Sequence, residues 1–332
     1  MEIMNLAEIM DKAIDTLKKH IKTIIMFTLV YGLISFVAAF AMILIGVIFS
    51  APLIYLGSGY LLPWIIIFFI VVIILTIFQT YNAGLIKISS QDFLNEKVSF
   101  EDGIKIAFKS IPKVFGVVFI SAAGFLPIAG IFAVVTYSIF DGYVNSIFLF
   151  NSFTGKDLMF IITAVILVIA AYVIYSAYNT ILCFSMHGVV IEKKGVFASI
   201  KRSFQLIKNN FWRIFGYLLL FSLTVYAFRS TIESFFLVLI NVLYLILKFL
   251  NVEPGYIAFI STLTTIIRWP LSIFSWLVIT PIGTIMISIL YFNQRFKKEG
   301  YDLVLRLRGI EKRERTKASE TFKYDNSNPT GV

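Results

Sequence analysis

Five stretches of this chain contain no charged residue and are long enough to cross a membrane. They cover residues 24–50, 61–86, 114–140, 158–191 and 269–294. An α-helix needs about 20 apolar residues to cross about 30 Å of hydrocarbon. A backbone in lipid must satisfy its hydrogen bonds internally, and these stretches lack the alternation of apolar and polar residues that is typical of barrel strands. The sequence therefore predicts five transmembrane helices here.

The composition agrees with this prediction and excludes a water-soluble globular protein. Hydrophobic residues make up 59% of the chain and charged residues 14%, whereas about 25% of the residues of soluble domains are charged. The acidic residues Glu2, Glu8 and Asp11 precede the first apolar stretch. This start is unlike a cleavable signal peptide, so we expect Met1 to begin the mature chain.

Side chains that could carry chemistry are scarce. Cys183 is the single cysteine, and the two histidines, His20 and His187, are far apart in the sequence without metal-ligand spacing. None of the five apolar stretches contains Asp, Glu, Lys or Arg. We therefore expect no catalytic residues, no metal site and no cofactor. A proton relay built from carboxylates is disfavoured for the same reason.

The region between residues 214 and 267 is interrupted by charges and leaves several arrangements open. A fifth span either ends at Phe228, or runs on to about Ile240 with Arg229 and Glu233 paired one turn apart. We favour the first arrangement. Residues 234–247 and 254–267 then lie at the outer interface, dip in as a re-entrant pair, or form two extra short spans. Either end of the fifth span brings the total to six spans, unless residues 234–247 and 254–267 form an extra pair.

The distribution of basic residues predicts the orientation. Of the 29 Lys and Arg residues, 25 fall in segments 1–22, 87–113, 193–213 and 295–332, which all lie on one side of a six-span arrangement. Cytoplasmic loops carry an excess of Lys and Arg. We therefore expect a multi-pass protein of the cell membrane with both termini in the cytoplasm.

A basic amphipathic segment precedes the first, third and fifth spans. The second and third of these segments align at an offset of 100 residues, which places Ser99 on Ser199 and Lys113 on Arg213. Asn5 with Glu8, and Ser99 with Asp102, have capping-box spacing. The chain thus reads as three repeats of amphipathic interfacial helix, span, outer loop and span, so the fold class is an all-α transmembrane helix bundle of about six spans.

These basic segments suggest two kinds of partner. The first is membrane lipid, with Lys and Arg contacting anionic head groups at the inner face. The second is a cytoplasmic or membrane protein, or a ligand that carries phosphate. Nucleic acid is not expected, because no nucleic-acid-binding fold or aromatic platform accompanies the charge.

Polar side chains recur toward the cytoplasmic ends of the even-numbered spans. Tyr–Asn pairs at 81–82 and 178–179, and Tyr291 with Asn293, suggest a shared polar cluster. The alternative is interhelical hydrogen bonding together with an interfacial tyrosine belt. The candidate cluster comprises Gln79, Tyr81, Asn82, Tyr178, Asn179, Tyr291 and Asn293.

Two stretches resemble a known family. Residues 291–303 match a closing motif at Tyr291, Arg295, Glu299, Gly300, Asp302 and Leu303, while Asn293 stands where the motif has Asp. Residues 198–216 resemble an internal segment of the same family. This family is the membrane domain of some bacterial glycerophosphoryl diester phosphodiesterases and of stand-alone relatives. The resemblance implies a membrane module over residues 1–308 without the separate catalytic domain, followed by a polar, disordered cytoplasmic tail over 309–332.

Two functions follow as hypotheses. The first is a non-enzymatic membrane module that associates with lipid or a partner protein at the cytoplasmic face. The alternative is a transporter or permease subunit for a lipid-like or hydrophobic substrate. An intramembrane enzyme is the least supported class, since acid–base residues are nearly missing from the spans. For the first hypothesis, the candidate cytoplasmic contact residues are Arg213, Arg295, Glu299 and Asp302.

Overall fold

The computed structural model describes residues 4–55, 61–141, 155–250, 255–301, 303, 304 and 307. Its secondary structure over these residues is helical, and six helical segments are long and apolar enough to cross a membrane. The predicted all-α bundle of six spans is therefore confirmed. Asp302 and the tail 309–332 lie outside the described residues. In chain order the helices are α1 Leu6–Lys19, α2 Ile21–Tyr55, α3 Leu61–Ser89, α4 Gln91–Leu94, α5 Phe100–Phe140, α7 Gly155–Leu182, α8 Ser185–Val190, α9 Val196–Ile207, α10 Phe211–Phe249 and α11 Tyr256–Glu299.

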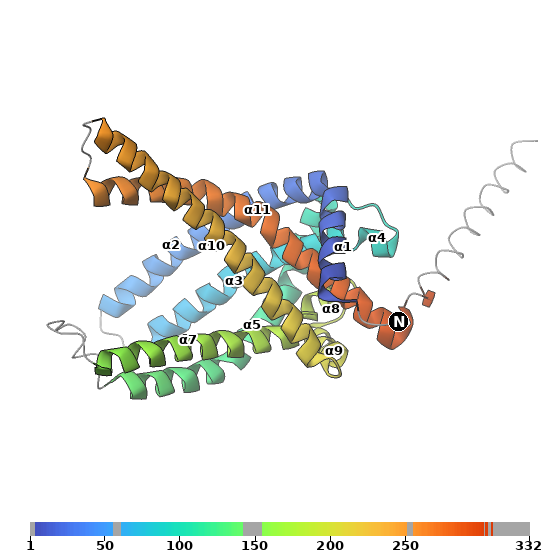
Figure 1. The fold of residues 1–332 in the computed structure, drawn as a ribbon. Helices are drawn as coiled ribbons and strands as arrows, with labels where there is room; N and C mark the ends of the chain where they lie inside the picture. The colour runs from blue at the N-terminus through green and yellow to red at the C-terminus, as the bar shows by residue number, and fades with distance from the viewer. Residues whose placement is uncertain are drawn as a thin grey trace, which may run out of the picture.

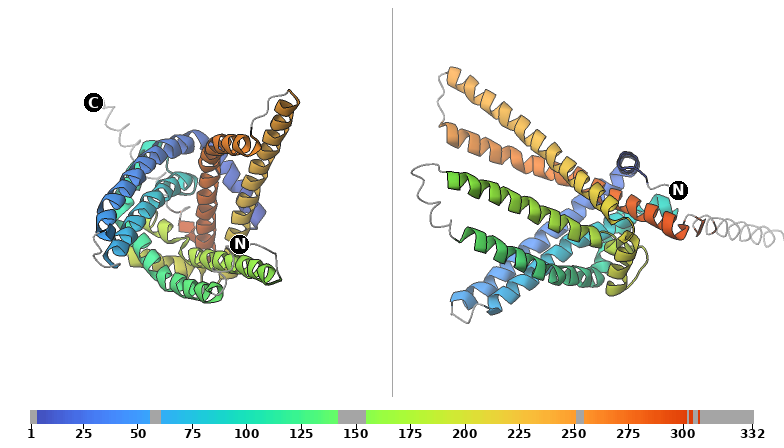
Figure 2. Two further views of the ribbon diagram at one scale, coloured as in Figure 1. Left: turned by 90° about the vertical axis from the view of Figure 1, so that its left-hand side faces the viewer. Right: turned by 60° about the horizontal axis from the view of Figure 1, so that its bottom comes forward.

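The long helices spread apart from one end of the molecule. The short helices α1, α4, α8 and α9 gather at that end, which we call the basal end (Figure 1). From there the pairs α2–α3, α5–α7 and α10–α11 run toward the opposite end, which we call the open end, and diverge on the way (Figure 2). The most extensive helix contacts are those of α3 with α5 and α2.

The packed core lies at the basal end. Phe27 of α2, Leu85 of α3 and Phe292 of α11 are fully buried there, together with Ile9 of α1 and Phe184 beside α8. Toward the open end, large apolar side chains are exposed instead, including Phe36, Val47, Ile131, Val168 and Phe235. A membrane supplies the apolar surroundings that these side chains lack within the chain. The basal half is therefore held by protein packing, whereas the open half faces lipid.

The lengths of the helices predict that they are tilted in the membrane. The span of α2 has 33 residues, which corresponds to about 50 Å at 1.5 Å per residue. The hydrocarbon layer is only about 30 Å thick. Long apolar helices adapt to this mismatch by tilting, and α2 and α10 run at clearly different inclinations in Figure 1.

Local signals predicted two helix starts correctly. The Ser99 hydroxyl accepts a hydrogen bond from the Asp102 backbone N–H, and the Asp102 carboxylate accepts one from the Ser99 backbone N–H at 3.1 Å. Asn5 accepts a bond from the Glu8 backbone N–H at 2.8 Å. The second amphipathic segment differs from the other two, because it is the first part of α5 rather than a separate helix. The turn at residues 208–210, by contrast, separates α9 from α10.

The region between residues 229 and 268 corrects the sequence interpretation. The favoured end at Phe228 is wrong, because α10 continues through Arg229 and Glu233 to Phe249. Residues 234–247 form neither an interfacial helix nor a re-entrant or extra span; they continue α10, and residues 256–267 begin α11. Arg229 donates to Glu233 at 2.9 Å and to Ser272 of α11 at 3.3 Å. Because Arg229 and Glu233 have partners within α10 and α11, these charges are compatible with a helix that continues past them.

We expect Arg229→Ala to destabilise the protein by more than about 1 kcal/mol, because it leaves Glu233 without its cation. An exposed pair four residues apart in a helix contributes only about 0.3–0.5 kcal/mol, whereas a charge in the hydrocarbon layer needs a partner. Thermal unfolding in detergent micelles measures the difference. Lys248→Ala, at an exposed position further along α10, is the control. Equal melting temperatures for both variants would place the Arg229–Glu233 pair in water.

Candidate functional site

A network of charged side chains ties the basal end together around Glu192, which follows α8. Its carboxylate accepts hydrogen bonds from Tyr291 of α11 at 2.6 Å and from Arg202 of α9 at 2.9 Å. Arg295 lies 3.5 Å from the same carboxylate oxygen. Glu299, one turn further along α11, accepts from Arg295 at 3.0 Å and also pairs with Arg202. We call these five side chains the Glu192 network.

The network is shielded from solvent, and its central carboxylate stays ionised. The side chains of Glu192, Arg295 and Arg202 are 9%, 11% and 14% exposed. Burial alone would raise the pKa of Glu192, but hydrogen bonds from Lys194, Tyr291 and Arg202 outweigh it and lower this pKa to about 2. Glu192 is therefore ionised at neutral pH and bridges the α8–α9 turn to α11.

The end of α11 folds back over this network. Tyr291, Arg295 and Glu299 are spaced four residues apart, which places them on one face of the helix. The Arg295 guanidinium lies 3.6 Å from the centre of the Tyr301 ring, as a cation–π contact. The helix ends at Gly300, whose φ of +58° is the left-handed conformation that glycine adopts at helix C-termini. Residues 291–301 of the closing motif thus pack against the chain's own helices.

A buried polar chain connects the network to the spans. Ser89 of α3 donates to Ser288 of α11 at 3.0 Å, and the Ser288 hydroxyl lies 3.0 Å from Nε2 of His187 on α8. The His187 ring stacks on Tyr291 with ring centres 4.8 Å apart. These contacts join three helices where their side chains are almost completely buried. Their geometry supports a structural role in fixing α8 against α3 and α11.

The candidate polar cluster divides among several helix contacts. In α3, Tyr81 bonds to Thr28 of α2 at 3.0 Å. Asn82 donates to Gln79 and accepts from Thr284 of α11, each at 3.0 Å. Tyr81 and Asn82 therefore link α3 to α2 and α11, which is the interhelical hydrogen bonding that the sequence offered as the alternative.

The remaining cluster candidates lie elsewhere. Tyr178 of α7 donates to the Ser121 carbonyl of α5 at 2.6 Å, and Asn179 donates to the Tyr175 carbonyl of its own helix. Tyr291 belongs to the Glu192 network, and Asn293 is buried in α11. Within the described ranges, hydrogen bonds do not join the seven candidate residues into one cluster.

The candidate cytoplasmic contact residues are partly engaged within the protein. Arg295 and Glu299 belong to the Glu192 network. Arg213, at the start of α10, donates to Tyr217 at 2.9 Å. Asp302 lies outside the described residues. Arg295 and Glu299 therefore stabilise the basal end, and other basic residues supply its free positive charge.

That free charge comes from lysines on α1, α2, α5, α9 and the turn after α9. They are exposed, and in the described part of the chain none of them has an ion pair. Three carboxylates at the same end pair with other cations, since Asp92 pairs with Lys19 at 2.7 Å and Glu192 and Glu299 belong to the network. Asp11 and Asp15 of α1 and Glu101 of α5 are exposed at this end as well. We call the exposed set the basal lysines: Lys18, Lys22, Lys105, Lys109, Lys201 and Lys208.

Sequence reasoning missed Glu192, Arg202, His187 and Ser288 as members of this site. One signal was present for Glu192, which is the only acid among six basic residues in segment 192–213. A lone carboxylate in a basic segment is a candidate ion-pair centre. The serine and histidine carried no comparable signal, because their partners lie about 100 residues away.

Comparison with protein-family models, with curated proteins and with solved structures found no match for this chain. Among the described residues, no group of three or more His, Cys, Asp or Glu side chains could hold a metal ion. The function is therefore inferred from the geometry and charge of the chain itself.

Proposed function

We propose that this integral membrane protein is a non-enzymatic membrane module whose basal end faces the cytoplasm and binds anionic lipid head groups. The observation that carries the proposal is the set of basal lysines, which are exposed and form no ion pair within the described part of the chain. Both termini then lie in the cytoplasm, in agreement with the distribution of basic residues. The chain would be a counterpart of the membrane domain that residues 291–303 resemble.

The amphipathic helices support binding at a membrane surface. Helix α1 buries Ile9, Ala13 and Leu17 on one face, which packs near α11, and exposes lysines on the other. Helix α9 likewise buries Leu206 while Lys201 is exposed. An interfacial helix of this kind places its lysines at the level of the lipid head groups, where each contributes about 1 kcal/mol on anionic membranes.

The proposal predicts that removing basal lysines weakens selection of anionic lipid. The variant changes Lys105, Lys109, Lys201 and Lys208 to Gln. The purified full chain is exposed to mixed micelles with equal phosphatidylglycerol and phosphatidylcholine, and retained lipids are counted by native mass spectrometry. We expect the wild type to retain more phosphatidylglycerol than phosphatidylcholine. In the variant, the ratio of the two retained lipids should be at least about tenfold lower.

Lys248→Gln is the control, because it removes a positive charge at the opposite end of α10. This variant should keep the wild-type preference for phosphatidylglycerol. Raising the salt concentration should weaken the wild-type preference, because exposed charges are screened. If the quadruple variant keeps the full preference, lipid binding by the basal lysines is wrong. Specific co-purification of one protein that is lost in the same variant would instead favour a protein partner at this surface.

A transporter or permease subunit is the second candidate. Amide side chains on exposed faces of two spans, Gln79 in α3 and Asn179 in α7, favour it, because polar groups that face lipid are costly. The closed packing of the basal end counts against transport by this chain alone, since a substrate route would have to pass fully buried side chains such as Phe27, Tyr291 and Phe292. Uptake of a fluorescent lipid into proteoliposomes would distinguish the two functions.

A further inference from the structure

Three aromatic side chains are strongly exposed at the basal end, on α9 and at the start of α10. Phe197, Phe204 and Trp212 are 77%, 52% and 78% exposed. Phe197 and Phe204 lie seven residues apart in α9, which places them on one face of the helix. Lys201 and Lys208 have the same spacing and form the neighbouring exposed stripe. We call the three rings the α9 aromatic rim.

The rim borders the face of α9 that packs against the rest of the protein. That face buries Ser203 and Leu206. Between it and the rim lies Ile200, which is half-buried and packs against the core cluster shared with α5. Ile200 is three residues from Phe197 and four from Phe204, so the three side chains are neighbours on the helix surface. The apolar face of α9 therefore continues beyond the part that protein covers.

Helix α1 is a useful comparison, because its apolar face is fully covered. It buries Ile9, Ala13 and Leu17. This helix is described over its whole length, and none of its large apolar side chains is exposed. The two amphipathic helices thus differ: α1 completes its apolar contacts within the protein, whereas α9 leaves two phenylalanine rings in need of another apolar contact.

Both ends of α9 lie at the level where apolar spans begin. At its start, a Cβ atom on Gly116 of α5 would lie 2.7 Å from a methyl group of Val196, and Gly116 is the third residue of the charge-free stretch 114–140. At its other end, the turn at 208–210 leads into α10, where Trp212 comes two residues before the apolar run that starts at Ile214. Helix α9 accordingly lies at the side of the basal end, beside the start of α10 (Figure 1). A helix that connects these two levels lies along the membrane interface.

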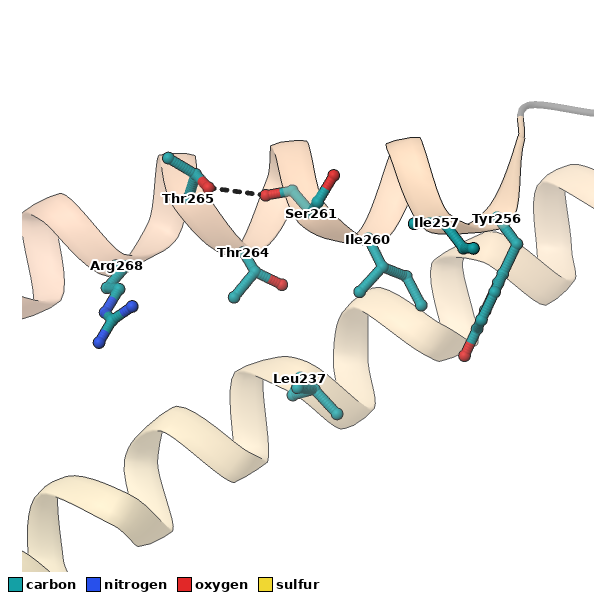
Figure 3. A pocket seen from close by; sticks show the side chains of 8 residues that line it. All are labelled: Leu237, Tyr256, Ile257, Ile260, Ser261, Thr264, Thr265 and Arg268. Carbon is teal, nitrogen blue, oxygen red and sulfur yellow. Dashed lines mark hydrogen bonds between the residues drawn. The ribbon is translucent and has the colours of Figure 1, made fainter. Parts of the chain in front are cut away.

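Exposed apolar side chains at the open end are of a different kind. In the furrow between the outer parts of α10 and α11, the apolar lining apart from Tyr256 is aliphatic, with Leu237, Ile257 and Ile260 (Figure 3). Helices that lie at a membrane interface instead combine Trp and Phe on the apolar face with Lys on the polar face. The exposed surface of α9 has this interfacial composition.

We propose that α9 is inserted into the lipid leaflet at the basal end, with the α9 aromatic rim at the boundary between head groups and acyl chains. Interfacial helices bury their apolar face about 5–10 Å into this boundary. Lys201 and Lys208 extend from the adjacent stripe toward the phosphates, while their methylene groups stay beside the rings. The inference rests on the proposed function, because it takes the basal end to lie at a membrane surface. It adds a lipid contact that is hydrophobic and independent of head-group charge.

The test measures how close each ring lies to the acyl chains. The full-length protein is reconstituted in nanodiscs that contain phosphatidylcholine brominated near the top of its acyl chains, because bromine quenches tryptophan fluorescence at short range. The difference between the wild type and Trp212→Phe isolates the signal of Trp212. Phe197→Trp and Phe204→Trp, each made in the Trp212→Phe protein, report the two positions of α9.

The matched control is Ala7→Trp in the same Trp212→Phe protein, which places an indole on the exposed face of α1. We expect the three rim signals to be blue-shifted and quenched at least about threefold more than the control signal, since only the rim reaches the acyl chains. All substituted side chains are exposed, so the variants should keep the size-exclusion profile and melting temperature of the wild type.

Three results would overturn the proposal. Rim signals that emit as in water would leave the rings free for a soluble protein partner. Blue-shifted signals without quenching would mean that protein, such as a second copy of this chain, covers the rings. Quenching no greater than that of Ala7→Trp would place the rim no deeper than α1.

The α9 aromatic rim and the basal lysines can fail separately. The variant with four basal lysines changed to Gln should lose its preference for phosphatidylglycerol and keep the quenching of Trp212. Raising the salt concentration should have the same two effects, because salt screens charges without weakening apolar contacts. Normal lipid preference with unquenched rim signals would reject only the rim. Quenched rim signals without any preference for phosphatidylglycerol would reject only the lysine site.

Discussion

Replacing Gly84 with leucine is expected to disrupt the packing between α2, α3 and α5 at the basal end. A Cβ atom at position 84 would lie 2.8 Å from the carbonyl oxygen of Gly103 and 2.4 Å from the ring of Phe27. The first of these atoms belongs to the α5 backbone, so it cannot move unless α5 moves. Close approach of helices at small residues is a general feature of membrane bundles. We expect a loss of at least about 3 kcal/mol, at the upper end for overpacked cores.

The yield of monodisperse protein and its melting temperature in detergent would measure this effect. Gly130→Ala is the control, because nothing lies within 4 Å of a Cβ atom at that position of α5. It should leave the protein unchanged or slightly more stable, since alanine favours a helix over glycine by about 1 kcal/mol. A Gly84→Leu protein that melts like the wild type would mean that α3 and α5 do not cross as closely as described.

Glu192→Ala is the second change with a large expected effect. It leaves two largely buried arginines, Arg202 and Arg295, with one shared carboxylate, Glu299, in place of two. Removing one partner of a buried ion pair typically costs about 3–5 kcal/mol. Glu96→Ala is a matched control, because Glu96 pairs with Lys87 but its side chain is 53% exposed. That change should cost at most about 1 kcal/mol.

Chemical or thermal unfolding in detergent would compare the two alanine variants. Glu192→Gln keeps the shape of the side chain and removes only the charge, so it separates the electrostatic effect from lost packing. If Glu192→Ala and Glu96→Ala destabilise equally, the Glu192 network does not hold α9 against α11.

The same carboxylate predicts how stability depends on pH. The pKa of Glu192 is about 2 in the folded protein, whereas the ordinary pKa of a glutamate side chain is 4.5. A carboxyl group whose pKa is lower in the folded state stabilises the fold above its unfolded pKa, and this stabilisation is lost as the pH falls. We therefore expect the melting temperature to fall between about pH 4.5 and pH 2. In Glu192→Gln the decline over this interval should be smaller, and an unchanged decline would assign it to other carboxyl groups.

The positions of the spans and of two helix starts were predictable because both depend on local information. A run of apolar residues longer than the hydrocarbon layer requires a helix wherever it lies in the fold. The caps at Asn5 and Ser99 involve side chains and backbone groups only three residues apart. Neither feature needs knowledge of a distant partner.

The end of the fifth span was predicted wrongly for the opposite reason. A charge at Arg229 marks a helix end when its partner is water, but it is compatible with a continuing helix when partners are present. One partner, Glu233, was visible one turn away, whereas Ser272 comes from α11. The choice between the two arrangements therefore depended on packing between helices.

The candidate site shows the same division between local and distant information. The four-residue spacing of Tyr291, Arg295 and Glu299 placed them on one helix face, so sequence alone could single them out. Their role depended on Glu192 and Arg202, which lie about 90 to 100 residues earlier in the chain. Sequence by itself thus determined which segments enter the membrane and where the positive charge gathers. Only the tertiary structure decided which charges are neutralised and which stay free, because ion pairing depends on distances between atoms of helices far apart in the chain.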